Sequence, residues 1–138
     1  MRIEFTIPGQ PVGKGRPKFA RKGGFVRAYT PEKTASYENL VAMAAHDAMK
    51  GKSLILGAAD VTVRMYVSVP SSWSKKKIIA ALAGEIRPIT KPDMDNVVKG
   101  IFDAMNGIVW KDDSQVTDCS VIKRYAETPR AEVTVEAA

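Results

Sequence analysis

The sequence has 138 residues, of which 45% are hydrophobic and 26% charged. This length and composition predict one domain with a buried core, which excludes a disordered tail and a collagen-like fibre. Residues 1–33 contain eight basic and two acidic residues, so they carry the whole net charge of +6. No segment approaches the roughly 20 apolar residues that cross a bilayer, and the amino terminus lacks a signal-peptide pattern. We therefore expect a cytoplasmic protein without membrane contact.

The amino-terminal third predicts a strand, a basic arm and a long helix. Every second residue over 3–7 is apolar, which is the period of a half-buried strand. Residues 8–29 are rich in glycine, proline and basic residues, and the glycine pair at 23–24 predicts a short hairpin within an extended, mobile arm. Apolar residues at helical spacing then predict a helix over residues 31–49.

The remainder predicts three strands and two shorter helices. Alternation over 61–69 gives a clear strand pattern. Ser74 is placed to cap a helix that ends before Gly84, and another helix is expected from Asp93 to Gly107. β-branched residues over 115–125 and 131–136 predict the last two strands. With no repeat or linker, the chain predicts a single mixed α/β (α+β) domain.

The predicted helix from Asp93 separates an apolar side from a charged one. At about 100° per residue, these apolar residues are expected to face the core: Val97, Val98, Ile101, Ala104 and Met105. The opposite side collects Asp95, Asn96, Lys99 and Asp103. Asp95 and Lys99 lie one turn apart and are direct neighbours. A second acidic pair, Asp112 and Asp113, reaches the first if the return strand runs beside the helix start.

Clustered carboxylates persist at neutral pH only when a cation neutralises them or protons are retained. Mg²⁺ is the natural candidate, because the sequence has no thiolate cluster and His46 is its only histidine. Such an ion would activate water and stabilise charge on a phosphate oxygen, and Lys99 would add a further positive charge. The pattern therefore indicates phosphodiester hydrolysis.

Each of these residues also has a purely structural explanation. Asp93 is an acceptable N-cap, and Asp95 in the first turn suits the helix dipole. The run 112–114 is by itself typical of a turn. Three lysines at 75–77 are typical of a solvated helix start, with phosphate contact as the alternative. Cys119 is the single cysteine, so an intramolecular disulfide is excluded. We expect its side chain to pack within its strand.

The basic arm indicates a polyanionic partner, because phosphate contacts release condensed counterions. Its candidates for phosphate contact are Lys14, Arg16, Lys18, Arg21, Lys22 and Arg27. Phe19, Phe25 and Tyr29 either stack on bases or anchor the arm to the core, and the sequence does not separate these alternatives. A flexible, solvated loop is the alternative for the charge itself.

Residues 91–116 read KPDMDNVVKGIFDAMNGIVWKDDSQV, with a D-x-D-N motif, a lysine four residues after the second aspartate, and a later D-D-x-Q-V. This segment resembles the signature of the RusA family of Holliday-junction resolvases. The opening strand, the GKGRPKF and AYTPEKTASYE segments and the terminal strands extend the resemblance over most of the chain. The resemblance implies a small homodimer that binds four-way junction DNA in recombination and repair. It would use Mg²⁺, or Mn²⁺ in its place, to nick opposing strands symmetrically.

Residue by residue, the resemblance places the essential metal-binding acids at Asp93, Asp95 and Asp113 and the essential lysine at Lys99. Asp112 is left as a neighbour that assists. This sequence has Pro92 where some members have a basic residue before the first aspartate, and its basic arm is longer than theirs. Both differences concern DNA binding and sequence preference. Members occur in bacteria and in phages or prophages. The alternatives are a junction-binding protein without turnover and a less selective nuclease of branched DNA.

Overall fold

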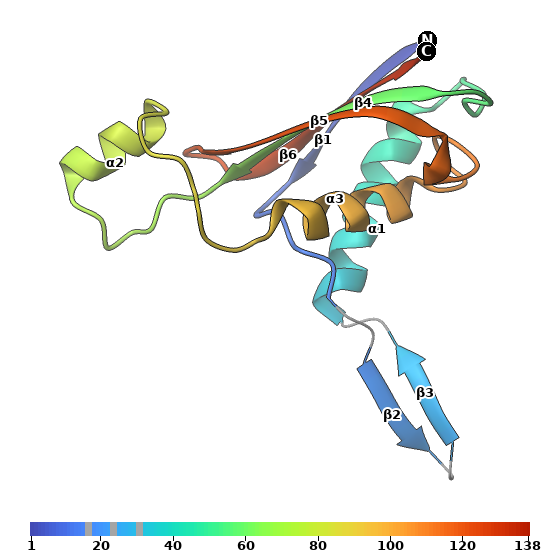
Figure 1. Cartoon of the computed structure of the whole chain (residues 1–138), viewed down its shortest axis with the longest axis horizontal. Coiled ribbons are helices and arrows are strands. Elements are labelled where there is room, and N and C mark those ends of the chain that lie inside the picture. Colours follow the sequence, from blue (N-terminus) through green and yellow to red (C-terminus); the bar gives the residue numbers. More distant parts are fainter. Residues whose placement is uncertain (16–17, 23–24, 30–31) are drawn as a thin grey trace.

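The computed structural model describes residues 1–15, 18–22, 25–29 and 32–138, with the backbone alone for 18–22 and 25–29. A four-stranded sheet lies at its centre, in the order β1-β6-β4-β5 (Figure 1). These strands are β1 (Arg2–Pro8), β4 (Ala59–Val67), β5 (Val116–Tyr125) and β6 (Arg130–Ala137). Strand β6 runs antiparallel to both neighbours, whereas β5 runs parallel to β4. The sheet is therefore mixed, and the predicted α+β class is confirmed.

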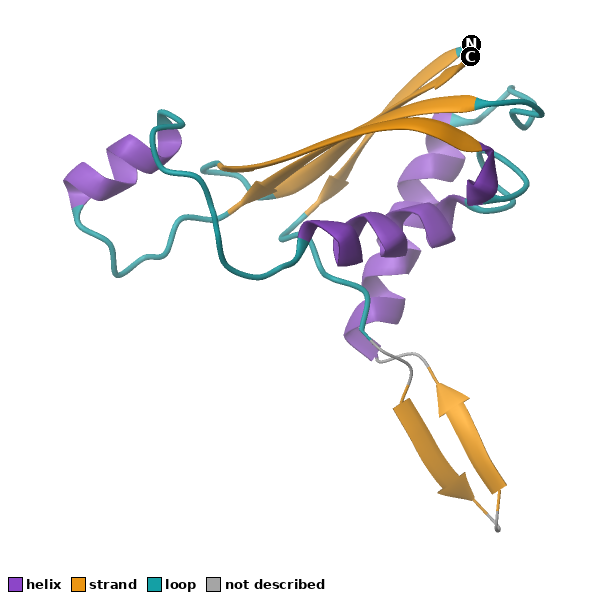
Figure 2. Cartoon of the chain, in the orientation of Figure 1, coloured by secondary structure: helices purple, strands orange, loops and turns teal. Residues whose placement is uncertain are grey.

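Two helices lie on the same face of this sheet (Figure 2). They are α1 (Glu32–Ala48) and α3 (Met94–Met105), and they also contact each other. Helix α2 (Lys75–Leu82) belongs to the connection between β4 and α3 and stands beyond the end of the sheet (Figure 1). A short 3₁₀ helix, η1 (Asp113–Gln115), leads into β5. The strands β2 (Lys18–Lys22) and β3 (Phe25–Tyr29) pair with each other as a separate antiparallel hairpin.

The core lies between the sheet and the two helices. Every second residue of β1 and β4 is buried, as the period-two pattern predicted. Helix α1 contributes Tyr37, Val41 and Ala45 to this core. Helix α3 contributes side chains that are fully buried: Val97, Ile101 and Met105. Trp110 is also fully buried, and its Nε1 donates a hydrogen bond to Asn106 Oδ1 at 2.7 Å, so the turn after α3 is fixed from inside.

The sequence patterns locate the described elements to within a few residues. Ser74 Oγ accepts a hydrogen bond from Lys77 N at 3.3 Å and caps α2 as predicted. Gly84 and Gly107 follow α2 and α3 with φ of 83° and 79°, conformations that side chains with a Cβ disfavour. The hairpin is confirmed by its strand pairing. The predicted turn at 23–24 and the predicted helix start at 30–31 lie outside the described residues.

Two expectations about burial are wrong. Cys119 lies in β5 but is exposed, because β5 is an edge strand of the sheet and its residues 117–120 are all exposed. Val98 is only partly buried on α3, since the core side of the helix is centred on Val97 and Ile101. Among the described residues, no helix is both long and apolar enough to span a bilayer.

The packing of α3 gives the first testable prediction. We expect Ile101→Ala to lower the free energy of unfolding by about 3 kcal/mol, because it opens a cavity between α3 and the sheet. The control is Ile79→Ala on α2, where the side chain is 60% exposed and the expected change is within about 0.5 kcal/mol. Urea denaturation followed by circular dichroism measures both. Equal effects of the two substitutions would contradict the packing described for α3.

Candidate active site

The start of α3 presents two carboxylates to solvent. Asp93 occupies the N-cap position with an extended backbone, but its side chain makes no capping hydrogen bond in the described structure. Asp95 follows in the first turn, and both side chains are exposed. The structural explanation for Asp93 therefore holds for its position only, and its carboxylate oxygens are not used to cap the helix. Both carboxylates can therefore bind a cation from solvent.

The segment that leads into Asp93 is held by a lysine from the sheet. Lys123 on β5 donates hydrogen bonds from Nζ to the carbonyl oxygens of Thr90 at 2.8 Å and Pro92 at 3.1 Å. These bonds tie the backbone on the amino-terminal side of Asp93 to the edge strand. The sequence reasoning missed Lys123, because its role depends on the parallel pairing of β5 beside β4, which no local pattern predicts.

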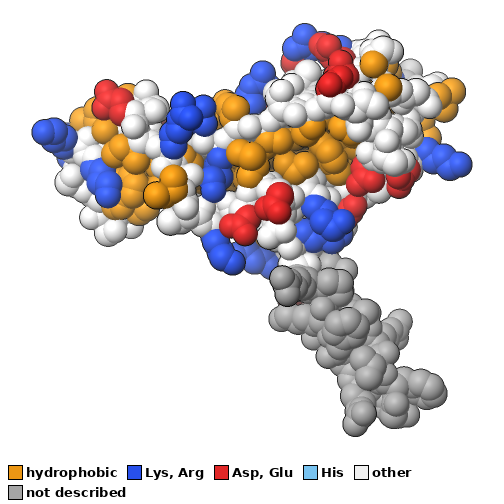
Figure 3. Space-filling model, in the orientation of Figure 1, with side chains coloured by type: hydrophobic (Ala, Val, Ile, Leu, Met, Phe, Trp, Pro, Cys, Tyr) orange, Lys and Arg blue, Asp and Glu red, His pale blue; other side chains and the backbone are white. Residues whose placement is uncertain are grey.

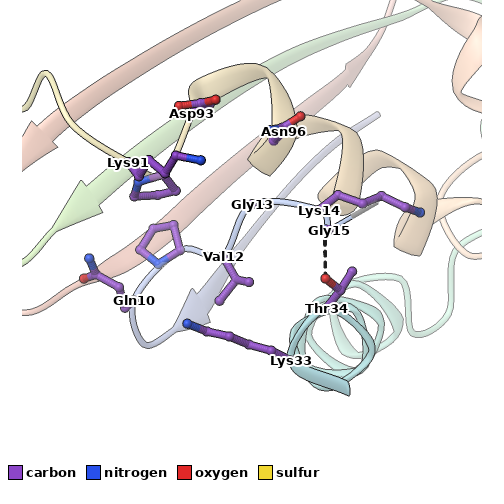
Figure 4. A pocket seen from close by; sticks show the side chains of 12 residues that line it. Gln10, Val12, Gly13, Lys14, Gly15, Lys33, Thr34, Lys91, Asp93 and Asn96 are labelled. Carbon is purple, nitrogen blue, oxygen red and sulfur yellow. Dashed lines mark hydrogen bonds between the residues drawn. The ribbon is translucent and has the colours of Figure 1, made fainter. Parts of the chain in front are cut away.

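Residues 12–15 pass between the starts of α1 and α3. Lys14 N donates to Asn96 O at 3.0 Å, and Gly15 N donates to Thr34 Oγ1 at 2.9 Å (Figure 4). A Cβ atom on Gly13 would lie 3.3 Å from Asn96 Cβ, closer than most such contacts. The glycine thus allows the base of the arm to approach α3 closely, which fixes where the arm leaves the body.

Lys14 has a different environment from the one predicted for a DNA-contacting lysine. Its Nζ lies 3.0 Å from Glu38 Oε1 on α1 and 2.6 Å from Asp103 Oδ2 on α3, and its side chain is 22% exposed. Desolvation opposes protonation, but hydrogen bonds to Asp103 and Glu38 outweigh it and raise the pKa of Lys14. Lys14 therefore stays charged and links α1 to α3. The side chains of Arg16, Lys18, Arg21, Lys22 and Arg27 lie outside the described residues.

The second acidic pair returns to the far end of α3 rather than to its start. Burial raises the pKa of Asp113, and the negative charges of Asp112 and Asp103 raise it further, while Lys99 opposes the shift. Lys99 Nζ also lies 3.9 Å from Asp103 Oδ2, one helical turn away. The structure thus brings Asp113, Asp103 and Lys99 together. The sequence placed Asp103 on the charged side of the helix but did not include it among the site residues.

The predicted acids do not form one closed group. Among the residues that the structure describes, no three acidic, histidine or cysteine side chains are arranged to hold a metal ion. The donors nevertheless suit Mg²⁺ chemically, because they are exposed or partly exposed carboxylates without a neighbouring thiolate cluster. Mg²⁺ usually binds through one or two carboxylates together with water and substrate phosphates. A partial set of carboxylates, open to solvent and substrate, therefore fits this ion.

Asp112 and Asp113 have different structural roles. Hydrogen bonding from the Ser114 side chain and then from the Ser114 backbone lowers the pKa of Asp112. The bond from Ser114 N to Asp112 Oδ2, at 3.0 Å, also caps η1. Gln115 Oε1 completes this capping box by accepting from Asp112 N at 3.2 Å, and it also accepts from Lys111 N at 2.9 Å. Gln115 Nε2 also donates to the carbonyls of Ile55 and Gly57, which anchors η1 to the body. Asp112 is therefore engaged in the turn, while Asp113 faces α3.

A cleft of about 790 Å³ opens beside the start of α3. Its walls come from residues 10–15, from Lys33 and Thr34 at the start of α1, and from the segment 91–96 (Figure 4). Three lysines, Lys14, Lys33 and Lys91, are among the lining residues, together with Asp93. Figure 3 shows acidic and basic side chains next to one another over the start of α3. Such a mixed lining suits a phosphate group that approaches a carboxylate-bound cation.

Comparison with known proteins gives two matches. A family model described as endodeoxyribonuclease RusA matches residues 8–136, a range that contains every candidate acid and lysine named above. A protein of Bacillus subtilis (strain 168), named uncharacterized protein YqaN, is 42% identical over 135 residues. The alignment covers 96% of this chain and 94% of that protein.

The contrast between the two neighbouring aspartates is testable without any substrate. In EDTA, we expect Asp112→Ala to lower the urea midpoint, because η1 loses its cap. Asp113→Asn is expected to leave the midpoint unchanged or to raise it, because it removes a negative charge beside Asp103 and Asp112. Equilibrium unfolding of both variants and the wild type measures this. The assignment of roles is wrong if Asp113→Asn destabilises the protein as much as Asp112→Ala does.

Proposed function

This chain belongs to the RusA family of endodeoxyribonucleases, and we propose that it resolves four-way DNA junctions by Mg²⁺-dependent phosphodiester hydrolysis. The observation that carries the proposal is the exposed pair Asp93 and Asp95 at the start of α3, beside a lysine-lined cleft. Carboxylates that neither cap the helix nor lie in the core are available to a cation, which in turn can bind a phosphate.

We propose that Asp93 and Asp95 hold the divalent ion directly, with Mn²⁺ able to replace Mg²⁺, and that Asp113, which approaches α3 beside Asp103, completes the metal site through water molecules on the ion. Asp112 is the weaker candidate, because its carboxylate caps η1. When bound, Mg²⁺ lowers the pKa of a coordinated water and stabilises negative charge on a phosphate oxygen. The chain itself positions these ligands: Lys123 holds the backbone before Asp93, and Gln115 anchors the turn that carries Asp113.

Lys99 supplies positive charge at the scissile phosphate in this proposal. Its side chain is 66% exposed and lies one turn beyond Asp95 on the same side of α3. Its contact with Asp103 is long, at 3.9 Å, so the ammonium group remains free to turn toward a phosphate. A positive charge placed where negative charge accumulates lowers the barrier for hydrolysis.

The DNA would be gripped on the arm side by the lysine-lined cleft and by the hairpin. Lys33 and Lys91 line the cleft beside Asp93, and the ammonium group of Lys14 is paired with Asp103 and Glu38. The arm residues proposed to contact phosphates, besides Lys14, are Arg16, Lys18, Arg21, Lys22 and Arg27. These contacts are independent of base sequence, so they set affinity rather than site preference.

We propose that the active form is a homodimer. A four-way junction has approximate two-fold symmetry, and two identical subunits related by one axis place two identical sites on opposing strands. One chain offers a single set of candidate acids, so paired nicks require a second subunit. The proposed setting is DNA recombination and repair in the cytoplasm of a bacterial cell, with a phage or prophage gene as an alternative origin.

The main prediction for catalysis concerns Asp95. We expect Asp95→Asn to slow single-turnover cleavage of a synthetic four-way junction at least about 100-fold, because the site loses a charge that stabilises the reaction. Junction binding should be equal or tighter, because a negative charge facing phosphate is removed. Rapid quench in Mg²⁺ and in EDTA measures cleavage, and fluorescence anisotropy measures binding.

The matched control is Glu127→Gln, which removes an exposed carboxylate from the turn between β5 and β6. This variant should cleave at the wild-type rate. Tight junction binding by the wild type without any metal-dependent nick would instead support a binding protein without turnover. Equal cleavage of junction, flap and duplex would support a less selective nuclease.

Lys99 gives a separate prediction. We expect Lys99→Met to reduce the single-turnover rate about 100-fold at saturating Mg²⁺. The Mg²⁺ concentration for half-maximal rate should stay close to the wild-type value, because lysine is not a metal ligand. A Mg²⁺ titration of the cleavage rate separates the two quantities. A variant that recovers the wild-type rate at high Mg²⁺ would show that Lys99 acts only on metal binding.

A further inference from the structure

The connection between β4 and α3 contains a second concentration of positive charge. Residues 70–92, here called the α2 lobe, hold one acid, Glu85, and these basic residues: Lys75, Lys76, Lys77, Arg87 and Lys91. Residues 34–138 have no net charge as a whole, so the lobe's excess of four positive charges is offset by an excess of four acidic residues elsewhere in this part of the chain. The lobe is therefore a local basic excess separate from the amino-terminal arm.

The lobe is exposed and continuous with the candidate active site. All five of its basic side chains are exposed. Figure 1 shows α2 and the β2–β3 hairpin on different sides of α3, and Figure 3 shows basic side chains over the lobe. The lobe ends at Pro92, directly before Asp93, where Lys123 holds the backbone. A strand of DNA engaged at Asp93 therefore has this basic surface beside it.

The lobe is anchored to the sheet by an aromatic contact. Trp73 packs edge-to-face against Tyr125 of β5, with ring centroids 5.4 Å apart. Lys77 Nζ lies 3.9 Å from the centre of the Trp73 ring, so Lys77 forms part of this anchor. Among the described residues, the ion pairs and cation–π contacts do not include Lys75 or Lys76. Of the three lysines at the start of α2, these two are therefore available to a ligand.

The position of these lysines is unfavourable for the helix itself. Lys75, Lys76 and Lys77 occupy the first turn of α2, which contains no acidic residue. The amino-terminal end of a helix carries a partial positive charge, so cations there oppose the helix dipole and anions are favoured. Helix stability therefore does not explain this arrangement. A polyanion bound at this end would interact favourably with both the lysines and the dipole.

We propose that the α2 lobe is a second DNA-contacting surface, at which Lys75 and Lys76 bind the phosphates of one duplex arm of the junction. The inference rests on the proposed function, because it assigns a further contact to the same substrate. With the hairpin on the other side of α3, the lobe would let one subunit contact two arms that diverge from the crossover. Ile79 and Ile89 are also exposed on the lobe, at 60% and 91%. Leu82 is exposed there too, at 36%, but the lobe's excess of four positive charges complements a polyanion, which favours DNA over a protein partner.

The test compares two double variants of equal charge change. Lys75→Gln/Lys76→Gln alters the lobe, and Lys50→Gln/Lys52→Gln alters exposed lysines just after α1. At about 0.1 M salt, we expect the lobe variant to bind a long-armed junction about tenfold more weakly. Its slope of log affinity against log salt should fall by about two. The control should bind almost as the wild type does and should keep the wild-type single-turnover rate.

The outcomes separate the failure of this inference from the failure of the proposed function. Wild type without junction binding or cleavage would overturn the proposed function, whatever the variants do. Wild type that cleaves junctions, with a lobe variant whose salt slope matches the control, would overturn the inference alone. A lobe variant that changes the solution mass but not the salt slope would overturn it as well and assign the lobe to protein contact. Thermal unfolding checks that the lobe variant folds, with an expected midpoint at or above that of the wild type.

Discussion

The burial of one side of α3 is the constraint on which the rest of the site depends. Val97, Ile101 and Met105 are fully buried against the sheet and α1. Because these residues recur at helical spacing, their burial fixes the rotation of the helix about its axis. Asp95 and Lys99 must then face outward, whatever surrounds them. The apolar residues of the signature segment therefore orient its charged residues, and a change in the core would turn the site away from its substrate.

Polar contacts from three segments that are distant in the sequence hold the backbone around the site in place. Lys14 from the arm bridges α1 and α3, Gln115 anchors η1, and Lys123 holds the backbone before Asp93. Each of these three side chains is only partly exposed, so solvent weakens its contacts less than those of a fully exposed side chain. Together they leave the carboxylates of Asp93 and Asp95 open while their backbone is fixed. This combination of a rigid frame and free ligands suits a site that acquires its ion and its substrate together.

Local patterns were enough to predict the described helices and strands, because caps, glycines and periodicity act over a few residues. They also predicted the charged side of α3. The contacts that depend on strand order could not be predicted this way. The exposure of Cys119, the role of Lys123 and the approach of Asp113 to Asp103 all follow from β5 lying at the sheet edge, parallel to β4. Asp93 and Asp112 show the same limit, since both occupy N-cap positions and only Asp112 caps.

The most direct test is the reaction of the wild-type protein with a supercoiled plasmid that extrudes a cruciform. Paired nicks made across the junction within one encounter convert such a plasmid to linear DNA, whereas single nicks give open circles. The proposed resolvase predicts linear product from the earliest times in Mg²⁺, with none in EDTA. Accumulation of open circles alone, or no metal-dependent product, would contradict a symmetric junction resolvase.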